Sequence, residues 1–276
     1  MRKSFSVVVS LFLVVTAILS ATLSQQFMMP AFARTLATSP VLGNVASYSV
    51  LAGSIVSNTG PTTVSGDLGV SPSIGVPPHV TGFPPGEVLA PSVIHDADAP
   101  AGLAQAANTA AFGALDQTCD VTYAGVQNLT LVSPLGPGVY CATSFSLSGN
   151  LTLIGSGVWV FKSESTVITS PSSSVTGGDP CNVWWRVGSS ATLDTGTTFV
   201  GNILALTSIT LNTGANLNGR ALAQTGAVTM ADNDISLVCA VNPGPTSTPT
   251  GTPAPTADDP VEEPSLSMTV YLPAIR

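Results

Sequence analysis

Charged side chains are scarce in this chain. Only 8% of its 276 residues are Asp, Glu, Lys or Arg, and the formal net charge is −8. Between residues 35 and 241 the only basic side chains are Lys162, Arg186 and Arg220. Because nucleic-acid binding requires clustered Lys and Arg to replace counterions, this composition argues against a nucleic-acid partner. The surface must be covered mainly by Thr, Ser, Asn and Gly.

Residues suited to catalysis or cofactor binding are equally few. The chain has two histidines, and it lacks a G-x-S-x-G turn, a phosphate-binding loop and a GxGxxG motif. We therefore expect no enzyme activity and no cofactor. His95, Asp96 and Asp98 are compatible with an acid–base or metal cluster, but they also fit the start of a helix, whose dipole favours carboxylates there. Residues 232–234 (Asp-Asn-Asp) fit either a calcium site at a turn or a polar cap on the fold.

The four cysteines are widely separated and form no C-x-x-C pair. Zinc sites usually show closely spaced ligands, whereas an even number of cysteines in an exported protein indicates disulfides. Four cysteines allow three pairings. Of these we favour Cys119–Cys141 and Cys181–Cys239.

Both ends of the chain differ from its middle. Residues 1–33 combine Arg2 and Lys3, a long apolar run and a small-x-small site at 31–33, which predicts a secretory signal peptide. A retained membrane anchor is the alternative, since the run approaches spanning length. Residues 34–241 are the expected folded domain, 242–264 a Pro/Thr-rich linker, and 265–276 a short apolar tail. We expect a secreted or cell-surface protein, with the tail as a candidate for cell-envelope attachment.

An internal repeat indicates the architecture. Residues 191–205 align with 209–223 at a constant 18-residue offset, so that Thr192 falls on Thr210 and Gly196 on Gly214. A fixed period of this kind is typical of repeat folds. It suits one coil of a β-solenoid, whose circuit would be about 60 Å at most. The alternative is a chance similarity within a β-sandwich.

Two further segments complete the predicted fold, which is all-β dominated with one α-helix. Residues 58–62 resemble 194–198, so the N-terminal part reads as one more coil, distant in sequence. Residues 96–117 carry an alanine-rich stripe at helical spacing. Asp98 is the expected N-cap and Pro100 lies in the first turn. We expect this thin helix to lie along a flat side of the solenoid.

Several longer motifs carry a resemblance to a known family. They include Tyr-Ser-Val-Leu-Ala-Gly-Ser at 48–54, Leu-Gly-Pro-Gly-Val-Tyr-Cys at 135–141 and Asn-Val-Trp-Trp-Arg-Val at 182–187. From about residue 42 to 239 the chain resembles the microbial ice-binding proteins of the DUF3494 type. The resemblance implies a discontinuous right-handed β-helix, a β-solenoid whose regular coils would follow the 18-residue period. It also implies an N-terminal coil docked against the C-terminal coils and one helix alongside, and we expect a monomer.

The resemblance also implies a site. Many members carry a T-[A/G]-x-[T/N] pattern on the flat face that meets ice, and three segments match it here. The predicted ice-binding residues are Thr59, Thr62, Thr195, Thr198, Thr213 and Asn216. Since glycine bends the motif, alternation alone does not decide which threonines point outward. The alternative function is a cell-envelope adhesin or surface-structure module that binds carbohydrate or protein.

Overall fold

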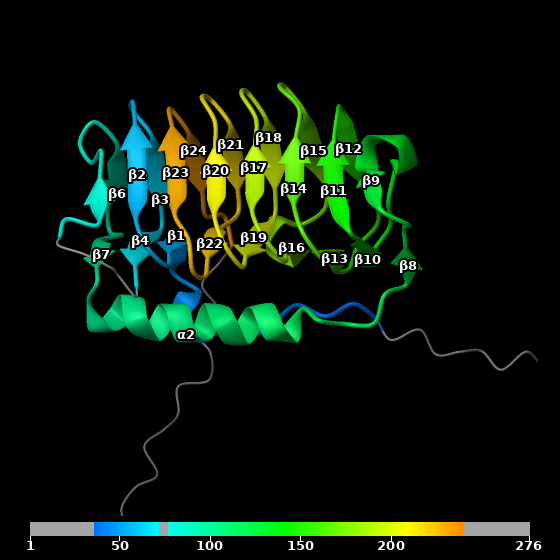
Figure 1. The fold of residues 1–276 in the computed structure, drawn as a ribbon, viewed down its shortest axis with the longest axis horizontal. Coiled ribbons are helices and arrows are strands. Elements are labelled where there is room, and N and C mark those ends of the chain that lie inside the picture. The colour runs from blue at the N-terminus through cyan, green and yellow to red at the C-terminus, as the bar shows by residue number, and fades with distance from the viewer. Residues whose placement is uncertain (1–35, 72–76, 240–276) are drawn as a thin grey trace, which may run out of the picture. The chain divides into compact units, whose positions relative to one another are not determined.

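Short parallel strands wind into three sheets (Figure 1), and apolar side chains fill the space that the sheets enclose. The computed structural model describes residues 36–71 and 77–239. The predicted signal peptide, the linker and the apolar tail lie outside the described residues. Within those two ranges, no helix has both the length and the apolar character needed to cross a membrane.

The chain visits the three sheets in turn, and every pair of neighbouring strands is parallel. Sheet A contains, in spatial order, β7 (Ile94–Asp96), β4 (Asp67–Val70), β1 (Tyr48–Ala52), β22 (Ala221–Ala223), β19 (Asn202–Ala205), β16 (Val183–Val187), β13 (Trp159–Ser163), β10 (Gly138–Ala142) and β8 (Val121–Thr122). Sheet B contains β5 (Val80–Thr81), β2 (Val56–Thr59), β23 (Val228–Ala231), β20 (Ile209–Leu211), β17 (Ala191–Leu193), β14 (Val167–Thr169), β11 (Ser144–Leu147) and β9 (Val126–Asn128). Sheet C contains β12 (Asn150–Leu153), β15 (Ser174–Gly177), β18 (Thr198–Val200), β21 (Asn216–Asn218), β24 (Asp234–Ser236), β3 (Thr63–Ser65) and β6 (Glu87–Leu89). Three 3-10 turns, η1 (Gly43–Val45), η2 (Leu129–Val132) and η3 (Pro180–Asn182), complete the description.

Alternation along each short strand builds the core. In β17 and β20 the first and third residues are buried and the middle one faces outward. The inward side chains stack from coil to coil, and an aromatic column adds to them: the Phe161 and Trp185 rings lie 4.1 Å apart, centre to centre. Each coil therefore rests on its neighbours, as in other quasi-one-dimensional folds.

The coils are not all of one length. Ala191 pairs with Ile209, which is the 18-residue step of the repeat. Val167 instead pairs with Ala191, a 24-residue step, because a longer turn precedes β16. The predicted 18-residue offset thus holds between β17 and β20, and the preceding coil is longer.

Glycine is required where the chain turns from sheet C to sheet A. Gly201 and Gly219 have φ values of 111° and 148°. A Cβ on Gly219 would lie 2.1 Å from the carbonyl oxygen of Gly201. The repeated glycine therefore allows two successive coils to approach closely at this corner.

The N-terminal coil lies beside the C-terminal coils, although the two are far apart in sequence. Strand β1 pairs with β22, β2 with β23, and β3 with β24. Arg220 contributes to this closure: it is buried, and its guanidinium donates to the Ala46 carbonyl and to the Asn202 side chain, both at 2.8 Å. Burial lowers the pKa of Arg220 to about 10.

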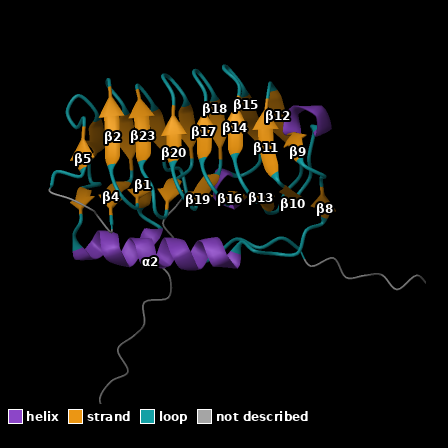
Figure 2. Ribbon diagram, viewed as in Figure 1, coloured by secondary structure: helices purple, strands orange, loops and turns teal. Residues whose placement is uncertain are grey.

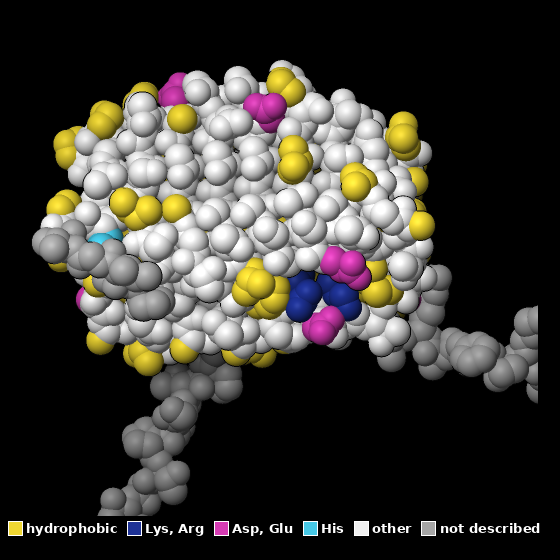
Figure 3. Space-filling view, viewed as in Figure 1, with side chains coloured by type: hydrophobic (Ala, Val, Ile, Leu, Met, Phe, Trp, Pro, Cys, Tyr) yellow, Lys and Arg dark blue, Asp and Glu magenta, His cyan; other side chains and the backbone are white. Residues whose placement is uncertain are grey.

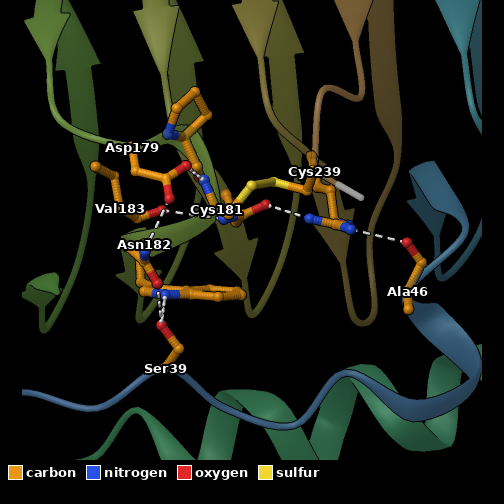
Figure 4. The surroundings of a disulfide bond; sticks show 11 residues. Ser39, Ala46, Asp179, Cys181, Asn182, Val183 and Cys239 are labelled. Carbon is orange, nitrogen blue, oxygen red and sulfur yellow. Dashed lines mark hydrogen bonds between the residues drawn. A yellow bond between two sulfur atoms is a disulfide. The ribbon is translucent and has the colours of Figure 1, made fainter. Parts of the chain in front are cut away.

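The described residues contain two disulfides, Cys119–Cys141 and Cys181–Cys239. This is the pairing predicted from the sequence. Figure 4 shows the second one beside η3, where the Asp179 side chain accepts from the Cys181 N–H at 3.0 Å. The same region holds the segment that precedes η1, because Ser39 bonds both Asn182 and the Trp184 ring nitrogen. The disulfide thus ties Cys239 to the segment around η3.

The single α-helix of the described residues, α2 (Ala99–Ala114), lies along the outer face of sheet A (Figure 2). Its Ala104 and Ala111 side chains pack on outward residues of that sheet, including Leu51 and Trp184. Asp98 is the N-cap and accepts from the Ala101 N–H at 2.9 Å, as predicted. The predicted bounds of 96–117 were too wide: Asp96 belongs to β7, and Ala97 takes a left-handed φ of 58°, which prevents an earlier helix start.

Candidate functional site

Four of the predicted site residues lie at the corner between sheets B and C. Thr195 and Thr213 are exposed in the turns that follow β17 and β20. Thr198 and Asn216 are the exposed first residues of β18 and β21, and they pair with each other in sheet C. The corner therefore presents two neighbouring copies of the motif.

The N-terminal copy of the motif aligns differently. Thr59 pairs with Ala231, and β23 pairs with β20 so that Met230 lies beside Leu211. Thr59 thus occupies the strand position of Asn212 in its own coil, which is one residue before the position of Thr213. The cause is the position of the bend: Gly60 takes the positive φ of 83° one residue earlier in its coil than Gly214 does, at 70°.

Thr62 is fully buried, so the prediction that it contacts ice was wrong. Its hydroxyl accepts a hydrogen bond from the Asn233 N–H at 3.1 Å inside the corner. The outward residue of this coil is the next one, Thr63, which pairs with Asp234. A buried backbone N–H requires a partner, and Thr62 supplies it from the inside.

The inside of this corner is polar along several coils. The hydroxyls of Thr169 and Thr197 lie 2.9 Å apart, and both residues are buried. Asn233 donates to the carbonyls of Asn212 and Ala215 at 2.9 and 2.8 Å. These side chains satisfy the backbone groups that the turn withdraws from the sheets.

The Asp-Asn-Asp segment forms part of the same corner. Asn233 points inward, whereas Asp232 and Asp234 are exposed. Among residues 36–71 and 77–239, no group of three His, Cys, Asp or Glu side chains is arranged to hold a metal ion. His95 and Asp98 lie 2.7 Å apart at the first turn of α2, where Asp98 serves as the N-cap.

Sheet B carries a continuous rank of outward side chains that crosses all of its strands. We call it the central rank. The register places its eight members side by side, from β5 to β9: Thr81, Ser57, Thr229, Thr210, Thr192, Ile168, Ser146 and Asn128. Seven of the eight are hydroxyl or amide residues, so the rank is polar without being charged.

The hydroxyls at the middle of the central rank make almost no hydrogen bonds to other described residues. In the described part of the chain, no residue hydrogen-bonds to the hydroxyl of Thr192 or Thr210. The Thr229 hydroxyl has only a long contact of 3.4 Å with that of Ser57. These groups are therefore free to bind water, in contrast to the buried hydroxyls of the corner.

The outer faces of sheets A, B and C differ in whether a helix covers them and in whether they expose charged side chains. Sheet A lies under α2. Sheet C exposes the carboxylates of Glu87 and Asp234. Figure 3 shows the face formed by sheet B, on which charged side chains lie only at the borders and hydrophobic ones are scattered. Sheet B is thus the open, uncharged wall of the fold.

Lys162 and Arg186 both make contacts that stabilise the fold. Lys162 forms an ion pair of 2.6 Å with Asp116 and donates to the Gln117 carbonyl at 3.0 Å. The hydrogen bond and charge of Lys162 lower the pKa of Asp116. Arg186 lies 4.2 Å above the Phe112 ring and donates to the Phe112 carbonyl at 3.1 Å. Both cations fasten the end of α2 to sheet A.

Comparison with known proteins identifies the family. A family model described as Ice-binding-like matches residues 50–236. The chain belongs to this family. The ice-binding protein of Nostoc sp. (strain HG1) is 44% identical over 214 residues, which covers 74% of this chain and 76% of that protein.

Solved structures of ice-binding proteins agree with this assignment. The protein from the Antarctic ascomycete Antarctomyces psychrotrophicus gives a TM-score of 0.65 at 35% identity, covering 74% of this chain and 100% of that one. An ice-binding protein from an Antarctic biological consortium gives a TM-score of 0.65 at 37% identity, covering 74% and 93%. The fold described above is therefore that of the ice-binding-like family: parallel β-sheets with one helix.

The central rank was not among the residues predicted from the sequence of this ice-binding-like protein. The signal was present, because Thr192 and Thr210 are equivalent in the 18-residue repeat and Thr229 lies in the partial third copy. Each stands between two apolar residues, the alternation of a half-buried strand. The T-[A/G]-x-[T/N] motif instead predicts contact at the neighbouring corner between sheets B and C.

Proposed function

We propose that this protein adsorbs to ice through the outer face of sheet B and thereby slows ice growth or recrystallisation, without catalysing a reaction. The observation that carries the proposal is the central rank, in which Thr192, Thr210 and Thr229 stand side by side. We propose that the protein is exported, in keeping with its two disulfides and its apolar N-terminal run. Ice is then its partner, and it acts as a monomer.

Regular spacing supports this role. Neighbouring strands lie about 4.8 Å apart. The outward hydroxyls of Thr192, Thr210 and Thr229 therefore repeat at a fixed step from strand to strand. Threonine is stiff at χ1, so each hydroxyl and methyl keeps its position. A surface that is ordered before it meets ice avoids the entropy cost of ordering side chains on binding.

The absence of charge supports it further. Ice offers an uncharged array of water molecules, whereas an ionised side chain orients water around itself. Taking such a charge out of liquid water is costly unless it finds a partner. The central rank holds no ionisable residue, and sheet C carries Glu87 and Asp234. Sheet B is for this reason the better ice-contacting face.

The residues of the corner between sheets B and C lie at the edge of the proposed face. We propose that Thr59, Thr195 and Thr213 border the face, because they end or closely follow strands of sheet B. Thr198 and Asn216 begin strands of sheet C, which forms a different wall. They therefore contribute less to ice contact than Thr192, Thr210 and Thr229 do.

Substitution of one residue on sheet B and one on sheet C tests the proposal. Thr210→Tyr places a ring at the centre of the rank, and Thr176→Tyr places the same ring on an exposed position of sheet C. We expect the purified wild-type protein to inhibit ice recrystallisation, Thr210→Tyr to lose most of this activity, and Thr176→Tyr to retain it. Both variants should unfold at nearly the wild-type temperature, because both side chains face outward and surface substitutions usually change stability by about 0.5 kcal/mol or less.

A third variant separates the two candidate surfaces. Thr198→Tyr changes the corner motif on its sheet C side. If Thr198→Tyr removes the activity and Thr210→Tyr leaves it intact, the ice-contacting face is the corner and the assignment to sheet B is wrong. A wild-type protein that neither shapes ice nor inhibits recrystallisation would refute the function itself.

A further inference from the structure

Ile168 is the one apolar member of the central rank. It pairs with Thr192 on one side and with Ser146 on the other. Its side chain is 48% exposed and points outward, because Val167 and Thr169 on either side are buried. A single large apolar residue therefore stands in an otherwise polar row.

We infer that Ile168 sets where the ice-contacting array ends. This inference rests on the proposed function and concerns the extent of its site. On one side of Ile168 lie Thr192, Thr210 and Thr229, followed by Ser57 and Thr81. On the other side Ser146 and Asn128 continue the rank but are cut off from it.

The chemistry of the side chain explains the boundary. Ile and Thr branch at Cβ in the same way, so both are stiff at χ1. Ile carries an ethyl group where Thr carries a hydroxyl, so it offers no hydrogen bond. A row with one hydroxyl or amide per strand is thereby interrupted on β14.

The surroundings allow the residue to be exchanged without disturbing the fold. Beneath it, the Thr169 hydroxyl is held by Thr197 and by the Asp194 N–H at 2.9 and 2.7 Å. Val167 is packed in the core. Because the strand is fixed from the inside, Ile168→Thr should change the outer face alone and make the polar rank continuous from β5 to β9.

The test uses the full chain and recrystallisation inhibition at a series of protein concentrations. We expect Ile168→Thr to act at a concentration roughly twofold to tenfold lower than the wild type, the range that one net hydrogen bond supports. Ile168→Val, which keeps the branched shape without a hydroxyl, should show no such gain. Ile168→Ala should match the wild type, since the array does not use this side chain.

A second substitution tests whether the array has become longer. Ser146→Ala should reduce the activity less in the wild type than in the Ile168→Thr background, because Ser146 lies beyond the boundary. In the Ile168→Thr background the same change should remove part of the gain. Equal effects of Ser146→Ala in both backgrounds would contradict the inference.

The outcomes separate the two proposals. If the wild type is active and Thr210→Tyr is not, but Ile168→Thr or Ile168→Ala weakens the activity, then Ile168 contacts ice itself and this inference alone is wrong. An equal gain in Ile168→Val and Ile168→Thr would show that side-chain height rather than the hydroxyl matters, and would likewise overturn it. A wild type without ice activity would overturn the proposed function and this inference together.

Discussion

Thr197 and Thr210 lie on neighbouring coils, yet their hydroxyls do different things. Thr197 is buried and its hydroxyl lies 2.9 Å from that of Thr169. Thr210 stands between two buried residues and faces outward, with no protein partner among the described residues. In this fold a threonine on the inside satisfies the turn, and one on the outside is free for water.

The inner threonine is expected to matter for stability and not for ice. Thr197→Val keeps the side-chain shape but removes the bond to Thr169 and the weaker one to the Ser170 carbonyl. We expect a loss of about 1–3 kcal/mol in the free energy of unfolding, the usual cost of an unpaired buried group. Thermal unfolding would measure it, and recrystallisation inhibition well below the melting temperature should be unchanged.

Thr213→Val is the matched control, since Thr213 is exposed at the same corner. Its stability should stay within about 0.5 kcal/mol of the wild type. If both variants were equally stable, the buried hydroxyl pair would not be holding the corner.

The candidate site could be predicted only in part from the sequence. The repeat places Thr192 on Thr210 and Thr195 on Thr213 without knowledge of the fold. It does not reveal that the first pair lies on the sheet that α2 leaves uncovered, because strand pairing and helix packing are long-range contacts. Nor does it reveal that Gly60 bends its coil one residue early, which buries Thr62.

At the scale of elements, α2 shows how so few charges are used. The helix itself carries no charged side chain, and Gln105 ties it to sheet A by donating to the carbonyls of Ala223 and Gln224 at 2.9 and 2.7 Å. Its end is held by Lys162 and Arg186. A helix without its own ion pairs thus depends on bonds from the sheet.

The bond from Arg186 can be tested directly. Arg186→Ala removes the contact with the Phe112 ring and the hydrogen bond to the Phe112 carbonyl. We expect it to lower the free energy of unfolding by about 1–3 kcal/mol and to speed hydrogen exchange near the end of α2. Ice activity should persist, because α2 packs on sheet A.

Arg186→Lys serves as the comparison variant, since it keeps the charge but not the planar guanidinium that stacks on a ring. It should recover only part of the lost stability. Full recovery would mean that charge alone holds the helix end.

The elements themselves were more predictable than their edges. Alanine spacing, Asp98 and Pro100 located the helix, and local similarity located the extra N-terminal coil. The helix start depends on the pairing of β7 with β4, a contact between segments that the sequence does not show as adjacent. Long-range pairing also decides that β1 closes on β22, where Arg220 reaches Ala46.

At the scale of the whole described body, each of the three walls has its own character. Sheet A carries the helix, sheet C carries exposed acids, and sheet B is open and uncharged. The few charged side chains are therefore distributed unevenly over the three sheets. The central rank of sheet B contains no ionised group.

This arrangement predicts that ice activity does not depend on pH between about 5 and 9. Asp194 borders sheet B, and hydrogen bonds from the Thr195 N–H and the Asn212 amide lower its pKa. A carboxyl with a lowered pKa in the folded state is already ionised above its ordinary value of about 4. The stabilisation that it gives is present above that pH and is lost only as the pH falls through the lowered pKa.

Neither histidine belongs to the central rank: the His95 ring pairs with Asp98 at the start of α2, and the side chain of His79 is buried against Asp96. The measurement is recrystallisation inhibition across this pH range, with the melting temperature followed in the same buffers. A change in stability without a change in activity would agree with the prediction. Activity that follows a titration while the melting temperature stays constant would show that a charged group contacts ice, and sheet B would then be the wrong wall.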